Sequence, residues 1–126
     1  MTSIATASAA VAALIHVGYF LLESVWFTRP KVYRRFFVDS PAEARTLRLM
    51  AFNQGFYNLF LACGAAAGAV AVAANAELVG RTLIVFSCAC MAAAGIVLFL
   101  SDRRFLRAGA IQTLPALVAV TAAAAA

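Results

Sequence analysis

Charged residues are scarce in this sequence, and acidic ones are the scarcest. Of 126 residues only 12% are charged, 65% are hydrophobic, and 5 are Asp or Glu. A soluble domain of this length needs about twice that charged fraction to cover its surface. The composition therefore excludes an ordinary soluble domain and indicates a lipid bilayer as the solvent.

Motifs of the common chemistries are missing as well. A single His and no second ligand cluster predict that no metal is bound. The 3 cysteines form an odd set without a Cys-x-x-Cys spacing, which argues against a disulfide relay. There is no phosphate loop, nucleophile motif or nucleic-acid module, so we expect no cofactor and no nucleic-acid partner.

The apolar residues fall in four long runs, and each approaches the roughly 20 residues that cross about 30 Å of hydrocarbon. Backbone amides in lipid must bond within their own segment, so the runs are helices. We predict an all-α membrane protein, a single domain over residues 1–126, folded as an antiparallel four-transmembrane-helix bundle. The runs are Ile4 to Phe27, Met50 to Ala74, Thr82 to Leu100 and Phe105 to Ala124.

The basic residues predict the orientation. Short loops rich in Lys and Arg lie in the cytoplasm, and no basic residue precedes the first run, as expected for a retained helix with its N-terminus outside. We expect a multi-pass protein of the cell (inner) membrane with both termini outside, whose charge attracts anionic lipid, not DNA. Arg81 is alone on the outer side, and the inner residues are Arg29, Lys31, Arg34, Arg35, Arg45, Arg48, Arg103, Arg104 and Arg107.

The sequence of the connection over residues 28–49 indicates two different segments. Lys31 to Val38 mixes aromatic and basic residues, which suits a segment lying in the headgroup layer. After it, Ser40 can cap a helix, Pro41 fits the first helical position, and Glu43 completes a capping box. The sequence predicts one helix from Pro41 to about Ala73, whose first turns form a cytoplasmic extension of the second span.

Small residues predict close helix contacts. Gly64 and Gly68 are four residues apart and flanked by alanines, a pattern that lets backbones approach closely in lipid. Two interpretations remain open, namely tight packing within one bundle and a homodimer seam through these two glycines.

Polar residues within the apolar runs mark the candidate site. Because His16, Tyr19, Glu23 and Trp26 follow spacings of three, four and three, they form one stripe, with His16 and Glu23 about 10 Å apart. Intramembrane groups that titrate are natural acid/base candidates, and we assign that role to His16 and Glu23. The candidate ligand-binding residues are Tyr19, Trp26, Asn53, Gln54, Tyr57, Asn58 and Gln112.

These residues come from the first, second and fourth runs, and their depths predict a shared polar pocket in the cytoplasmic half of the bundle. A structural interpretation competes with this one. Asn and Gln in membrane helices often only bond helices together, each contributing about 0.6 to 2 kcal/mol. Glu23 lies near enough to the interface to pair with Arg29 and have no further role.

The same residues resemble a known family. His16 with Glu23 and Trp26, the run Asn53 to Ala62, and Gln112 with Pro115 resemble a bacterial family described as domain of unknown function 1304. Its members are small four-helix membrane proteins, and the resemblance covers nearly the whole chain. It implies a fold and a location but no activity. A more distant similarity to DoxX-like four-helix membrane proteins rests on architecture alone.

Three functions follow as hypotheses. The preferred one is a pocket for a small lipophilic or amphipathic molecule, with acid/base chemistry such as isomerisation or hydrolysis as an extension, so that enzyme activity stays open. The second is a proton-coupled small-molecule transporter using Glu23. The third is a structural or accessory membrane subunit.

Overall fold

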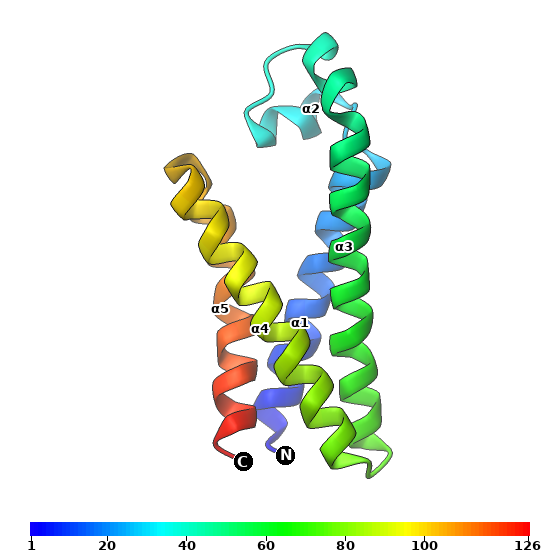
Figure 1. The fold of residues 1–126 in the computed structure, drawn as a ribbon, viewed down its shortest axis with the longest axis vertical. Helices are drawn as coiled ribbons and strands as arrows, with labels where there is room; N and C mark the ends of the chain where they lie inside the picture. Colours follow the sequence, from blue (N-terminus) through cyan, green and yellow to red (C-terminus); the bar gives the residue numbers. More distant parts are fainter. The chain divides into compact units, whose positions relative to one another are not determined.

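The chain is mostly helical, and no strand is present (Figure 1). The computed structural model describes residues 1–126. The prediction of an all-α fold is therefore confirmed. In chain order the elements are α1 (Ser3–Phe20), the π-helical turn η1 (Leu21–Val25), α2 (Pro30–Tyr33), the 3₁₀ turn η2 (Arg34–Phe36), α3 (Pro41–Ala73), α4 (Glu77–Ser101), the 3₁₀ turn η3 (Arg103–Phe105) and α5 (Leu106–Ala124).

Four helical segments are long and apolar enough to cross a membrane, which confirms the predicted number of spans. Large apolar side chains lie on their outside, such as Leu14 and Leu78, which are 73% and 80% exposed. Small residues, mostly alanines, and a few polar groups make up much of the inside, together with Ile84 and Met91. The segments are Ser3–Val25, Pro41–Ala73, Glu77–Ser101 and Arg103–Ala124.

The start of α3 follows the capping pattern of the sequence. The Glu43 amide donates to Ser40 Oγ over 3.1 Å, and Pro41 occupies the first helical position. The Glu43 carboxylate accepts from the Asp39 amide at 3.1 Å, one residue before the amide that a capping box normally uses. The predicted helix from Pro41 to about Ala73 is confirmed.

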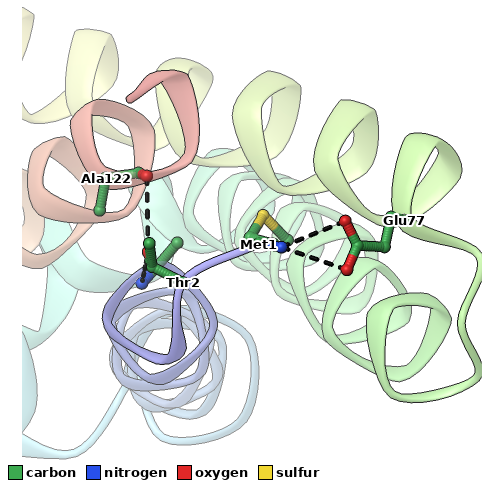
Figure 2. A network of polar contacts seen from close by, with 5 residues as sticks. Met1, Thr2, Glu77 and Ala122 are labelled. Carbon is green, nitrogen blue, oxygen red and sulfur yellow. Dashed lines mark hydrogen bonds and ion pairs between the residues drawn. The ribbon is translucent and has the colours of Figure 1, made fainter. Parts of the chain in front are cut away.

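By its internal contacts the chain divides into two compact units, residues 1–15 with 61–126 and residues 16–60. The first unit holds both ends of the chain (Figure 2). There, Thr2 Oγ1 donates to the Ala122 carbonyl over 3.5 Å, and the Met1 amino group lies 3.1 Å from the Glu77 carboxylate. These contacts tie α1, α4 and α5 together at one end of that unit.

Small residues bring α3, α4 and α5 close together within the first unit. A Cβ added to Gly68 would lie 2.9 Å from the Gly80 carbonyl oxygen, and one added to Gly64 would meet Ser87 Oγ. Between α4 and α5, a Cβ on Gly109 would lie 2.8 Å from the Gly95 oxygen. The face of α3 that carries Gly64 and Gly68 is thus occupied by α4, which favours tight packing within one chain as their role.

The second unit has a small core of its own at the connection between α1 and α3. Phe27, Tyr33, Val38 and Ala44 are buried together there. Tyr33 is only 2% exposed. The segment predicted to lie in the headgroup layer is therefore folded over this core through α2 and η2, with its basic side chains outside.

The close contact between α4 and α5 gives a first prediction. Gly95→Ala places a methyl group against the Thr113 hydroxyl and 3.0 Å from the Gly109 carbonyl oxygen. We expect a loss of about 1 to 3 kcal/mol in the free energy of unfolding, because neither backbone can move aside cheaply. Reversible unfolding in mixed detergent micelles, followed by circular dichroism, measures it.

Gly18→Ala is the matched control, because a Cβ at this helical glycine meets nothing within 4 Å. Alanine is the better helix former by about 1 kcal/mol, so this variant should be as stable as the wild type or more stable. Equal losses for the two variants would contradict the proposed contact.

Candidate functional site

The last turn of the first span is a π-helix, η1. The Trp26 amide donates to the Leu21 carbonyl, five residues back, at 2.9 Å. Single π-helical turns are rare and frequently occur at functional sites. Because the turn is wider than an α-helical one, the stripe predicted from His16 to Trp26 at a constant angle does not continue unchanged past Phe20. Glu23 and Ser24 lie in this turn.

A glycine lets α3 approach η1 closely. A Cβ on Gly55 would meet Ser24 Oγ and lie 3.0 Å from the Ser24 amide nitrogen. Because Gly55 has no Cβ, the Ser24 hydroxyl can approach α3, and it donates to the Phe52 carbonyl at 2.7 Å. Gly55, the centre of the Asn53 to Asn58 run, therefore has a steric role, which is to bring the two backbones together beside Glu23.

Glu23 and Asn58, two of the predicted site residues, are in direct contact. Asn58 Nδ2 donates to Glu23 Oε2 at 2.7 Å, and Asn58 is only 7% exposed while Glu23 is half-buried. No basic side chain lies within 4.0 Å of the Glu23 carboxylate. Arg29, the partner that the structural interpretation suggested, lies over the Trp26 ring at 5.5 Å instead.

Beside Glu23 the second unit is hollowed. The hollow is open to the outside and has a volume of about 380 Å³. It brings together one carboxylate, two guanidinium groups, two hydroxyl groups and an apolar patch. Its lining residues are Glu23, Ser24, Val25, Phe27, Thr28, Pro41, Arg45 and Arg48.

With this geometry described, comparison with known proteins identifies the family. The model of a protein family of unknown function, DUF1304, matches residues 10–124. The chain belongs to this family. No curated protein and no solved structure matches the chain. The resemblance noted in the sequence is thereby confirmed, and the description of the DUF1304 family assigns no activity.

The other predicted site residues of this DUF1304 protein lie in different surroundings. His16 is fully buried, and its ring meets Tyr19 edge to face with 6.1 Å between centroids. Asn53, Gln54 and Tyr57 are exposed on α3. None of these five lines the hollow. Their predicted functional roles stay predictions.

Gln112 belongs to the first unit, where it bonds α5 to α4. Its Nε2 donates to the Met91 carbonyl at 3.3 Å, and the neighbouring Thr113 hydroxyl donates to the Ala92 carbonyl at 3.4 Å. Both side chains are buried. This is the helix-bonding role that the structural interpretation assigned to such amides.

Four polar lining residues, Ser24, Thr28, Arg45 and Arg48, were not among the sequence candidates. The two arginines had been interpreted as topology signals only. The usable signal was their spacing, because residues three apart near the start of one helix share a face. Ser24 gave a signal too, since it directly follows the only carboxylate of the first run.

The contact between Glu23 and Asn58 gives a second prediction. Asn58→Ala should lower the free energy of unfolding by about 1 to 3 kcal/mol, because it leaves a half-buried carboxylate without its donor. Asn53→Ala, on the exposed face of the same helix, is the matched control and should change it by less than about 0.5 kcal/mol. Unfolding in mixed micelles measures both. If the two variants lost equal stability, the prediction that the bond from Asn58 to Glu23 stabilises the fold would be contradicted.

Proposed function

We propose that this chain is a membrane protein that binds a small amphipathic molecule in the hollow beside Glu23. The observation that supports this most is the half-buried carboxylate, which Asn58 holds at 2.7 Å on the wall of an open hollow. A carboxylate near hydrocarbon is costly to maintain, and such groups usually mark ligand or ion sites. A residue that served only to bond helices would not need a hollow beside it.

The position of the hollow along the sequence supports a ligand with both polar and apolar parts. Glu23 lies near the end of the span Ser3–Val25, and Arg45 and Arg48 lie in the first turns of α3, before its apolar run begins at Met50. The charged side chains therefore belong to the headgroup level of a bilayer. The apolar part of the lining adjoins the hydrocarbon side of that level.

We propose that the hollow lies on the cytoplasmic side, because this connection is rich in basic residues. Short loops with such an excess of Lys and Arg are retained in the cytoplasm. The ligand would then enter from the cytoplasm or from the inner leaflet of the cell membrane. Acid/base chemistry would depend on Glu23, the one carboxylate in the lining, since His16 does not reach the hollow.

A structural or accessory subunit is the second candidate, and one observation favours it. The polar side chains Gln112 and Thr113 both donate to backbone carbonyls of α4 at 3.3 and 3.4 Å. Their role is complete without a ligand. In the second unit, by contrast, the polar groups border an open volume, which is why we prefer binding.

The orientation gives a third prediction. We expect a cysteine at Thr46 to be labelled from the cytoplasmic side only, and one at Ala76, in the connection between α3 and α4, from the outside only. Each is introduced into a chain whose Cys63, Cys88 and Cys90 are replaced by Ala. An impermeant maleimide applied to intact cells and to inverted vesicles measures it. The reverse labelling pattern would invert the proposed topology.

Binding itself gives a fourth prediction. Thr28 is exposed and lines the hollow, whereas Thr46 is exposed on α3 outside it. In the cysteine-free chain, an amphiphile bound in the hollow should slow maleimide labelling of Thr28→Cys by about tenfold at a concentration ten times its Kd, because bound ligand covers the site. Thr46→Cys should be labelled at an unchanged rate.

The probes are dodecylamine, oleate and three phospholipids that share one pair of acyl chains. Their headgroups are ethanolamine, choline and glycerol. Protection of Thr28→Cys by at least one probe supports the proposal. If none of the five probes changes the labelling rate of either cysteine, the hollow binds no amphiphile, and the accessory role replaces the proposed one.

A further inference from the structure

The charges that line the hollow also indicate what kind of headgroup it accepts. We infer that it accepts a zwitterionic head made of a phosphate and a primary ammonium group. This inference rests on the proposed function, because it names the ligand of the same hollow.

The positive and negative side chains of the hollow do not form a close ion pair with each other. Glu23, Arg45 and Arg48 share its lining, yet no ion pair within 4.0 Å joins the carboxylate to either guanidinium. Elsewhere in the chain an adjacent pair does close, since Arg104 and Asp102 lie 2.7 Å apart. A plain anion in the hollow would face Glu23, and a plain cation would face two arginines. A ligand with both charges satisfies all three groups.

The arginines suit a phosphate in particular. A guanidinium presents its N–H donors in a planar fork that matches two phosphate oxygens at once. Both side chains are exposed, so they can turn toward an incoming headgroup without disturbing the core. They precede the apolar run that begins at Met50, so in a membrane we expect them at the level of the lipid phosphates.

At the Glu23 end, the hollow offers hydrogen-bond acceptors to a ligand. A carboxylate has about four acceptor positions, and Asn58 occupies one of them through Oε2. The Ser24 hydroxyl directs its proton to the Phe52 carbonyl at 2.7 Å, so its oxygen is also left to accept. The ligand must therefore bring donors. A primary ammonium brings three, whereas a trimethylammonium brings none.

The shared chemistry of the ligand is thus an ammonium group joined by a short linker to a phosphate. The head of phosphatidylethanolamine has it, and so does free phosphoethanolamine. The apolar lining residues Val25, Phe27 and Pro41 favour the lipid as the source.

The full wild-type chain tests this directly. Native mass spectrometry of the protein in detergent measures the binding of phosphatidylethanolamine, phosphatidylcholine and phosphatidylglycerol with identical acyl chains. We expect the ethanolamine lipid to bind about tenfold more tightly than the other two, because only its head brings a positively charged group with N–H donors to Glu23 while the arginines hold the phosphate.

Two variants separate the two ends of the hollow. Glu23→Gln should reduce the binding of the ethanolamine lipid to the level of the glycerol lipid and leave the latter unchanged. The double variant Arg45→Ala with Arg48→Ala should weaken the binding of all three lipids. Asp39→Asn and Arg35→Ala remove exposed charges of the same unit outside the hollow, and these controls should bind as the wild type does.

The headgroup series needs no variant, so the inference can be tested even where a substitution prevents folding. Equal binding of the three lipids by the wild type, with Thr28→Cys still protected by one of them, would overturn the inference and leave the proposed function in place. If no probe protected Thr28→Cys, both the inference and the proposed function would be overturned. Displacement of the lipid by an equal concentration of free phosphoethanolamine would support the headgroup chemistry but overturn the lipid as its source.

Discussion

Hydrocarbon offers no hydrogen bonds, and this constraint accounts for where the polar side chains of the chain lie. Several hydroxyl and amide groups of the long helices donate to a backbone carbonyl. Thr82, Ser101 and Thr121 bond a carbonyl four residues back, and Gln112 bonds the neighbouring helix α4. Asn58 differs from these groups, because it donates to another side chain, the Glu23 carboxylate. That pair has a chemistry that helix bonding alone does not require.

Close helix approach is the second requirement, and small residues meet it at each contact. Dispersion replaces the hydrophobic effect between helices in lipid, so backbones must come near each other to gain it. Gly95 and Gly109 do this for α4 and α5, and Gly55 does it for α3 beside Ser24. At Gly55 the close approach also decides where the Glu23 carboxylate meets Asn58. Packing and site geometry are therefore set by the same residue.

The sequence predicted the elements well because their signals are local. Run lengths gave the four spans, and Ser40, Pro41 and Glu43 gave the start of α3. The π-helical turn at Leu21–Val25 could not be predicted, because one extra residue in a turn depends on what packs against it.

The inward face of α3 was harder to predict than its ends. Gln54 and Asn58, both candidate ligand-binding residues, are four residues apart, yet Asn58 is buried and Gln54 is exposed. The buried positions instead follow the small residues, at spacings of three and four. From Gly55 onward they are Gly55, Asn58, Ala62, Ala65 and Gly68. Small side chains, more than polar ones, mark the face of a membrane helix that packs against its neighbours.

The exposure of the remaining polar residues sharpens the choice between binding and structure. Asn53 and Gln54 lie within about two turns of the place where the apolar run of α3 begins, so their amides can reach the headgroup layer without a protein partner. Among the charged side chains of the four candidate spans, all are exposed except Glu23. Only for Glu23 does burial therefore remove water from a charged group, which costs free energy. A chain that needed Asn58 only to bond α3 to α1 could do so with a neutral partner at lower cost, since a backbone carbonyl already serves Ser24 in the same turn. The retained carboxylate, beside an open hollow with two arginines, is the feature that a purely structural role leaves unexplained.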